Sequence, residues 1–346
     1  MGTPEEDAGP WSPPVTNAGT PGWRDSETPW EPEECETLVQ LDLWSYDDGV
    51  FVLQDYEDGT GGSGCLMYQR ISYNDGSGWT DYYEQCSMTE HELGSITGFP
   101  GGQLMAAGSG RTAGPVLWIY EDDAELSADL DVLDMFVVNE NLAYAIDHEK
   151  AYRYDGIDWE PVPAYFPYEL DSIWADATDL YGVGPLGTII SYAGVDWVVH
   201  DSGTIESLST VWGFGGNNVW VGSAESGLLL HYDGVAWTPH QWPVRPPGAD
   251  ATIQGMWGQD GVLFFHTHTQ LVRWDGTEFT DLSTWPCEEL EIAPGEIVCD
   301  NGLLVESIWG NSPTELFVGL RDTSIWPGDC SALFLLWFDG VEYHWL

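Results

Sequence analysis

The sequence predicts an all-β fold, a seven-bladed β-propeller of four-stranded antiparallel blades. A unit of about 40 residues repeats along the chain from residue 38 onward. Each unit divides into four short β-rich runs that Gly, Asp and Asn interrupt, and no unit shows helical periodicity. Four strands at a period near 40 residues are typical of a propeller blade.

The repeating unit is complete in residues 210–237, where two apolar runs containing Trp precede an apolar strand that ends in Tyr-Asp-Gly. The aromatic or small residue of the first run recurs at Trp44, Thr97, Phe136, Trp174, Trp212, Trp257 and Trp309. The closing turn recurs at Asp75-Gly76, Asp155-Gly156, Ala193-Gly194, Asp233-Gly234, Asp275-Gly276 and Asp339-Gly340. The second unit keeps only a degenerate turn around Tyr120-Glu121-Asp122.

Seven units follow from these positions, with steps of 38, 40 and 42 residues between Gly156, Gly194, Gly234 and Gly276. Their expected bounds are about 38–91, 92–131, 132–169, 170–207, 208–250, 251–305 and 306–346. We therefore expect one propeller domain over residues 37–346.

The turn chemistry predicts tight hairpins within the blades. Asp-Gly between two apolar runs favours a two-residue type I′ turn, which needs positive φ at both central residues. Two positions before the first-run aromatic stands a residue that is small or polar in every unit: Asp42, Ser95, Asp134, Ser172, Thr210, Gly255 and Ser307. Apolar runs that do not alternate with polar residues indicate strands buried on both faces.

The pattern S-I-W-G … D-V-W-x-V-G … G-x-I-x-H-Y-D-G-x-x-W resembles a repeat of bacterial exported and lipoprotein β-propellers. The resemblance covers residues 38–346 and is best in 170–200, 208–240 and 306–343. It implies a propeller fold and an extracytoplasmic setting, and it implies no activity.

Residues 1–36 differ in composition from the rest of the chain. They contain seven prolines among scattered Gly, Ser, Thr and Glu, and such a segment buries too little apolar surface to offset its ordering entropy. We expect an acidic, Pro-rich linker or tether. Its tryptophans Trp11, Trp23 and Trp30 are candidates for docking on the folded body or on a partner.

The charge balance excludes several partners. The chain has 58 acidic and 8 basic residues, a formal net charge of −50. This charge argues against nucleic acid and anionic membranes, whose phosphates require Lys and Arg. It favours a soluble monomer, and the functional alternatives are a cationic partner or divalent metal ions. No run of 18 apolar residues predicts a membrane span.

Six cysteines without CxxC spacing indicate disulfides rather than zinc ligands, and therefore a secreted or surface-tethered protein. Residues 1–7 lack a basic and then apolar start, so we expect the export signal to be absent from this chain. A two-residue turn at Asp75-Gly76 would place Cys65 opposite Cys86. Cys287 and Cys299 lie in one insertion, and Cys35–Cys330 would join the first blade to the last and close the ring.

Few other residues suggest chemistry. Trp242, Trp285, Trp326 and Trp345 lie outside the repeat and are candidate ligand platforms. His266 and His268 would share one face of a strand, but no third metal ligand lies nearby in sequence. Calcium is the one possible cofactor, at Asp55, Glu57 and Asp58 before Gly59. Paired acids for glycoside hydrolysis cannot be selected among so many carboxylates.

The leading functional interpretation is a non-enzymatic, extracytoplasmic recognition scaffold without a cofactor. It would bind a protein or a glycan through loops at one mouth of the ring, because loops on rigid scaffolds carry function. The alternative is a carbohydrate-active enzyme, a glycoside hydrolase or lyase, with acidic residues at the central channel. The sequence assigns no catalytic residue, no binding residue and no metal site.

Overall fold

The computed structural model describes residues 37–46, 49–57, 67–87, 93–99, 103–107, 114–120, 123–147, 150–163, 169–243, 251–285, 288–289, 297–298, 303–322 and 332–346. The predicted linker 1–36 and five of the six cysteines lie outside these residues. No helix within the described ranges has the length and apolar character needed to cross a membrane.

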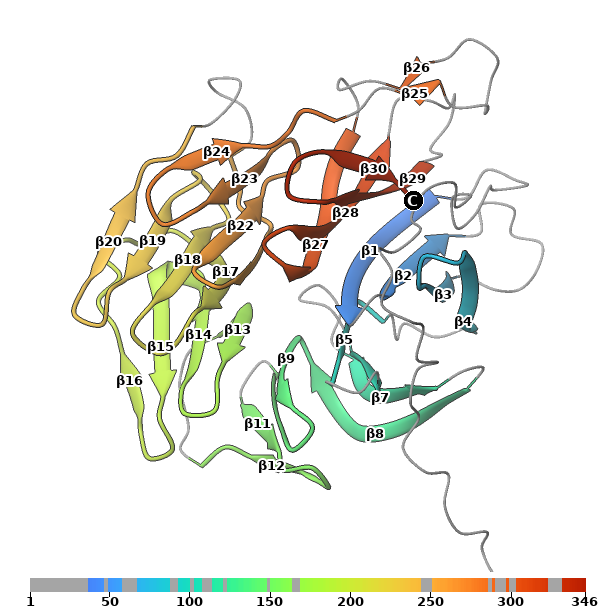
Figure 1. The fold of residues 1–346 in the computed structure, drawn as a ribbon. Helices are drawn as coiled ribbons and strands as arrows, with labels where there is room; N and C mark the ends of the chain where they lie inside the picture. Colours follow the sequence, from blue (N-terminus) through green and yellow to red (C-terminus); the bar gives the residue numbers. More distant parts are fainter. Residues whose placement is uncertain are drawn as a thin grey trace, which may run out of the picture.

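The chain is a seven-bladed β-propeller, as predicted: seven four-stranded antiparallel sheets surround a common axis (Figure 1). The first three blades consist of β1 (Thr37–Tyr46), β2 (Gly49–Glu57), β3 (Met67–Asn74), β4 (Trp79–Ser87); β5 (Ser95–Gly98), β6 (Leu104–Ala107), β7 (Gly114–Tyr120), β8 (Asp123–Val132); β9 (Asp134–Asn139), β10 (Leu142–Ile146), β11 (Ala151–Tyr154), β12 (Trp159–Pro161).

The fourth, fifth and sixth blades consist of β13 (Ser172–Ala175), β14 (Leu180–Gly184), β15 (Thr188–Tyr192), β16 (Trp197–Val199); β17 (Leu208–Gly213), β18 (Val219–Ser223), β19 (Leu229–Tyr232), β20 (Trp237–His240); β21 (Gly255–Gln259), β22 (Val262–His266), β23 (Leu271–Trp274), β24 (Phe279–Asp281). A 3₁₀ turn, η1 (Pro185–Gly187), joins β14 to β15. The two-stranded sheet β25 (Glu288–Glu289) and β26 (Ile297–Val298) follows the sixth blade.

The seventh blade consists of β27 (Leu303–Ser312), β28 (Glu315–Asp322), β29 (Ala332–Phe338) and β30 (Tyr343–Trp345), so it starts three residues before the predicted bound. Each of the seven four-stranded sheets takes its strands from one continuous segment. Blades one and seven, at the two ends of the described chain, therefore meet by packing: β1 lies beside β27 (Figure 1). Leu41 and Leu43 pack against Phe317 and Leu335, and the Ser45 hydroxyl lies 2.8 Å from Asn311 Oδ1.

The blades pack on one another through the repeated aromatic position. In blades one, four and six the indoles of Trp44, Trp174 and Trp257 are at most 4 % exposed. Each covers a glycine of the next blade, where an added Cβ would come within 2.8 Å of the ring: Gly98, Gly213 and Gly310. The glycines thus leave room for three tryptophans that pack between neighbouring blades.

The outer turns differ from the predicted type I′ geometry. Tyr232 pairs with Trp237 and Phe338 with Tyr343, so four residues connect these strands rather than two. Only the glycine has positive φ, as at Gly234 (φ 88°). The aspartate instead accepts hydrogen bonds from the backbone N–H groups two and three residues later: Val235 and Ala236 both donate to Asp233 Oδ1. Asp stabilises this turn by satisfying backbone donors.

The longer turn changes the register on which the Cys65–Cys86 pairing was predicted. Asn74 pairs with Trp79, and a β-bulge beyond Ile71 shifts the register again, so Tyr68 lies opposite Cys86. The register argument for that disulfide was wrong. Each of the three predicted pairings includes at least one cysteine outside the described residues: Cys65 in the first, and both members of Cys287–Cys299 and Cys35–Cys330. All three disulfides therefore stay predictions.

The two faces of the ring have different connections. At one face, called here the turn face, the first strand of each blade meets the second and the third meets the fourth after at most five residues, as at 99–103 and 214–218. At the other, called here the loop face, the connections vary from a single residue, Leu133, to segments 241–254 and 282–302. The antiparallel order of each sheet puts all connections of one kind on the same face.

Candidate functional site

A cavity of about 570 Å³ lies on the axis of the ring, lined by the innermost strands of all seven blades. Asp171 and Gln254 line it just before β13 and β21, and His268 lines it just after β22. These positions are the strand ends at the loop face. The cavity volume falls within the range of about 300–1,000 Å³ that is usual for ligand sites.

Three aromatic side chains form the floor of the cavity. The rings of Phe136 and Trp212 have centroids 5.8 Å apart, and those of Trp212 and Trp309 have centroids 6.0 Å apart. These residues come from blades three, five and seven, which are not neighbours, so their rings meet across the axis. Trp212 donates its indole N–H to Gly258 O at 3.1 Å, and the ring faces are what remains for a ligand.

The wall above this floor is a polar ring, formed by the residues two positions before the aromatic position: Asp42, Ser95, Asp134, Ser172, Thr210, Gly255 and Ser307. Asp42 accepts the N–H of Leu43 at Oδ1 and the N–H of Ile96 at Oδ2, both at 2.9 Å. Since Ser307 also donates to Asp42 Oδ1 at 3.0 Å, this carboxylate connects blades seven, one and two.

Asp134 repeats the arrangement between blades three and four. Its oxygens accept the N–H groups of Met135 and Ile173, each at 2.8 Å. Desolvation by burial raises the pKa of both Asp42 and Asp134 from 3.8 to about 6, although the hydrogen bonds act in the opposite direction. The negative charge of Asp42 adds to the rise at Asp134.

In blade six the polar-ring position is Gly255, which has no side chain, and the imidazole of His266 fills the space beside it. A Cβ added to Gly255 would lie 2.7 Å from His266 Nε2, so the imidazole occupies the space that a serine would need. His266 is buried, and desolvation lowers its pKa to about 4. The imidazole is therefore neutral at pH 7 and adds no positive charge to the cavity.

The mouth of the cavity is lined by Asp171, Gln254, His268, Glu306 and Arg321. Arg321 and Glu306 form an ion pair at 2.6 Å, and Gln254 Nε2 lies 3.2 Å from His268 Nε2. The carboxylate of Asp171 has no hydrogen-bond or ion-pair partner among the described residues. Burial, with a smaller contribution from the charge of Glu169, raises its pKa.

The structure brings His266 and His268 to one cavity, but β22 ends at His266 and His268 lies in the following turn.

The tryptophans outside the repeat are not open platforms. Trp242 is 8 % exposed and donates to Gly227 O, and Trp285 is 6 % exposed against Tyr343. Trp345 packs on Phe334, and Trp326 lies outside the described residues.

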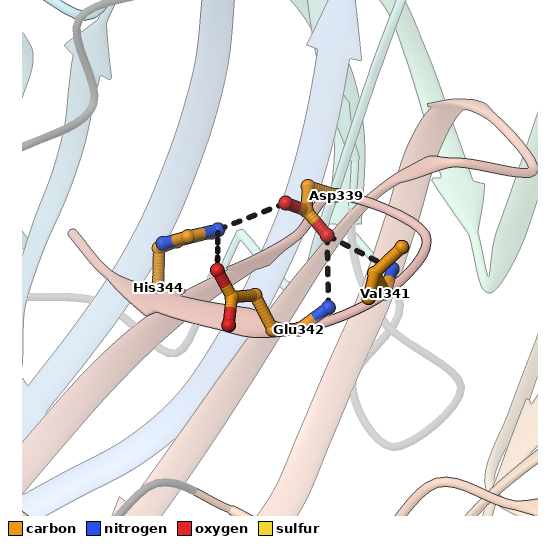
Figure 2. A network of polar contacts seen from close by, with 4 residues as sticks. All are labelled: Asp339, Val341, Glu342 and His344. Carbon is orange, nitrogen blue, oxygen red and sulfur yellow. Dashed lines mark hydrogen bonds and ion pairs between the residues drawn. The ribbon is translucent and has the colours of Figure 1, made fainter.

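The predicted calcium loop is only partly a loop, because Asp55 and Glu57 belong to β2. Asp58 is not among the described residues. Within the described ranges, one group of three possible metal ligands comes together: Asp339 and Glu342 in the last outer turn and His344 in β30 (Figure 2). Asp339 Oδ1 accepts the N–H groups of Val341 and Glu342, and Oδ2 lies 3.1 Å from His344 Nε2. The aspartate thus has the same turn-stabilising role as Asp233.

The residues of the cavity were visible in the sequence as a repeat position but were assigned no role. The signal was that this repeat position, immediately before an apolar residue, holds Asp, Ser or Thr in six units and Gly in one. A charged residue at that position in only two of the seven units, Asp42 and Asp134, distinguishes it from ordinary strand-edge polarity.

The comparisons with known proteins show the fold alone. No family model matches the chain, and no curated protein matches it. A catalytically inactive virginiamycin B lyase from Staphylococcus aureus with quinupristin is 10% identical, with a TM-score of 0.61 over 84% of this chain and 94% of that one. The WD40 propeller domain of Doa1 is 10% identical, with a TM-score of 0.57 over 82% and 89%. YCF48 bound to D1 peptide is 13% identical, with a TM-score of 0.55 over 90% and 97%.

Proposed function

We propose that the protein is a non-enzymatic recognition scaffold outside the cytoplasm, which binds a partner at its loop face. One observation carries this proposal: the cavity opens at the face where the connections vary in length, and an aromatic floor closes it toward the turn face. Variable loops around a concave site on a rigid frame are a common arrangement for recognition. The even set of six cysteines supports the extracytoplasmic location.

The use made of the cavity carboxylates favours binding over catalysis. In Asp42 and in Asp134, one carboxylate oxygen accepts the N–H of the following residue and the other accepts an N–H of the next blade. A general acid or a nucleophile in glycoside hydrolysis must direct an oxygen at the substrate. These carboxylates direct theirs at the frame of the ring. Of the three similar structures described above, one is named as a lyase and one is bound to a peptide, so the fold accommodates both classes.

The loop face also carries an exposed apolar pair. Leu186 and Ile205 are 81 % and 82 % exposed and lie on adjacent connections, held by a hydrogen bond from Gly187 N to Glu206 O at 2.8 Å. Leu186 adopts φ 57°, a conformation that is costly for a bulky side chain. Both residues lie on connections of the loop face, where apolar side chains suit contact with a protein better than contact with solvent.

The test is selection of binders from a random peptide display library on the intact protein, followed by titration against two matched variants. Ile205→Ser removes an exposed apolar residue at the loop face. Val235→Ser removes one that is 86 % exposed at the turn face. We expect Ile205→Ser to weaken binding and Val235→Ser to leave it unchanged. Peptides that depend on Val235 alone would contradict the assignment of the face.

A glycan array and a panel of glycoside hydrolase and lyase substrates complete the test. We expect no turnover. Hydrolysis or elimination of any substrate, lost in Asp42→Asn or Asp134→Asn, would overturn the non-enzymatic proposal and favour the carbohydrate-active alternative.

A further inference from the structure

We propose that the central cavity binds a cationic side chain, a lysine ammonium or an arginine guanidinium, of a protein partner. This inference rests on the proposed function of the loop face and specifies the chemistry of its ligand. Three observations carry it: the wall of the cavity has more negative than positive charge, aromatic ring faces form its floor, and its mouth is open at the loop face.

The wall of the cavity holds negative charge that the protein does not neutralise. Asp42, Asp134 and Asp171 line the cavity, and none of them forms an ion pair within the described chain. The one arginine of the lining, Arg321, is already paired with Glu306 at 2.6 Å. Burial raises the pKa of all three aspartates, so their ionised forms lack solvation that a bound cation would replace.

The floor offers the second element of a cation site. The rings of Phe136, Trp212 and Trp309 are half-buried rather than buried, because part of their surface faces the cavity. A cation within about 6 Å of an aromatic ring face is attracted by its quadrupole, and Trp is the most favourable ring. Acidic walls above an aromatic floor select a cation that also has an apolar stem, as Lys and Arg side chains have.

A side chain of a protein suits this cavity better than a free metal ion. The oxygens of Asp42 and Asp134 already accept backbone N–H groups, so few lone pairs remain for direct metal coordination. A guanidinium or ammonium needs a negative potential and a ring face rather than six converging oxygens. The net charge of −50 steers a basic segment toward the protein over distances of about a Debye length.

The experiment is isothermal titration calorimetry of the full chain with four short peptides, Ac-Gly-X-Gly-NH₂, where X is arginine, lysine, citrulline or norleucine. Citrulline and norleucine keep the shape of the stems and remove the charge. We expect the arginine and lysine peptides to bind at least about tenfold more tightly than their neutral partners, and the difference to shrink with added NaCl. Equal affinity for charged and neutral peptides would overturn the proposal.

Three variants locate the site. Asp171→Asn removes a charge at the mouth without touching the inter-blade hydrogen bonds, and Phe136→Leu removes one ring face from the floor. Asp196→Asn makes the same charge change at an exposed turn-face position and serves as the control. We expect the first two to weaken the arginine peptide several-fold and the control to have no effect. Full binding in both cavity variants would contradict the site.

The outcomes separate this inference from the proposed function. If library-selected peptides lose affinity in Ile205→Ser but need no basic residue and are insensitive to Asp171→Asn, the loop face binds a partner and the cation site is wrong. If no peptide depends on Ile205 while free arginine peptides bind, the cavity takes a cation and the wider recognition surface is wrong. Spermidine is a further arm, since tight binding of this free amine would contradict a protein side chain as the ligand.

Discussion

Two groups of aspartates make the same kind of hydrogen bond, one group buried in the cavity and the other exposed in the outer turns. The cavity group is Asp42 and Asp134, and the turn group is Asp155, Asp233, Asp275 and Asp339. In both places a carboxylate accepts two backbone N–H groups. The pKa of the cavity aspartates is raised to about 6, whereas hydrogen bonds lower the pKa of Asp275 to about 2. Burial, and not the number of hydrogen bonds, therefore decides the sign.

The two groups also join different parts of the molecule. A turn aspartate satisfies donors within its own four-residue loop, so its effect is local. A cavity aspartate accepts the N–H of the neighbouring blade, Ile96 for Asp42 and Ile173 for Asp134. The same residue type thus stabilises a hairpin at the turn face and holds blades together at the axis, where its charge remains available to attract a ligand.

The largest expected effect is the loss of a cavity aspartate. Asp134→Ala leaves the N–H groups of Met135 and Ile173 without their acceptor, and we expect the free energy of unfolding at pH 5 to fall by roughly 2–4 kcal/mol. Urea denaturation measures it. Thr210→Ala, at the same repeat position in blade five, is the matched control and should cost less. Equal losses would show that the carboxylate is not what joins the blades.

The pH dependence of that loss comes next. A folded pKa raised above the unfolded value means that the aspartate contributes most when both states are protonated, and its contribution declines as pH rises from about 4 through 6. The loss caused by Asp134→Ala should therefore be smaller at pH 7.5 than at pH 5, by about 1 kcal/mol. A loss that grows between pH 5 and pH 7.5 would indicate a lowered pKa instead.

For the turn aspartate, the contribution to stability should depend on pH in the opposite direction. Because the pKa of Asp275 is lowered to about 2, its stabilising effect is present above the unfolded pKa and disappears as pH falls from about 4 toward 2. Asp275→Ala should destabilise equally at pH 5 and pH 7.5, and the difference from wild type should shrink steadily as pH falls from about 4 toward 2. Parallel urea titrations of the two proteins would detect it, and a difference that stays constant between pH 5 and pH 2 would count against the turn geometry.

The smallest expected effect is that of salt on the cavity aspartates. Added NaCl should raise the melting temperature, because the net charge of −50 is spread over a solvated surface and is screened over about 10 Å at 0.1 M. The titration midpoints of Asp42 and Asp134, followed by carboxyl ¹³C NMR, should stay near 6, since desolvation sets them. Midpoints that fall toward 4 in molar salt would show that repulsion between charges dominates.

Much of the architecture could be read from the residues one by one. Strands end and the next strands begin where the repeat predicted. A strand ends just before each of the turns at Asp155, Asp233, Asp275 and Asp339, and the next strand begins at the aromatic residue after the turn. The exact turn could not be read, because Asp-Gly suits both a two-residue type I′ turn and the four-residue loop found here. That choice depends on the pairing of Tyr232 with Trp237 across the hairpin.

The sequence by itself determined the number of blades and their order, because these depend on a local periodicity that recurs along the chain. Only the tertiary structure decided which copies do something else. Phe136, Trp212 and Trp309 turn to the axis while Trp44, Trp174 and Trp257 cover glycines of the next blade. Asp42, Asp134 and Asp171, up to 129 positions apart in the chain, share one cavity only because seven blades close into a ring and place their innermost strands around a single axis.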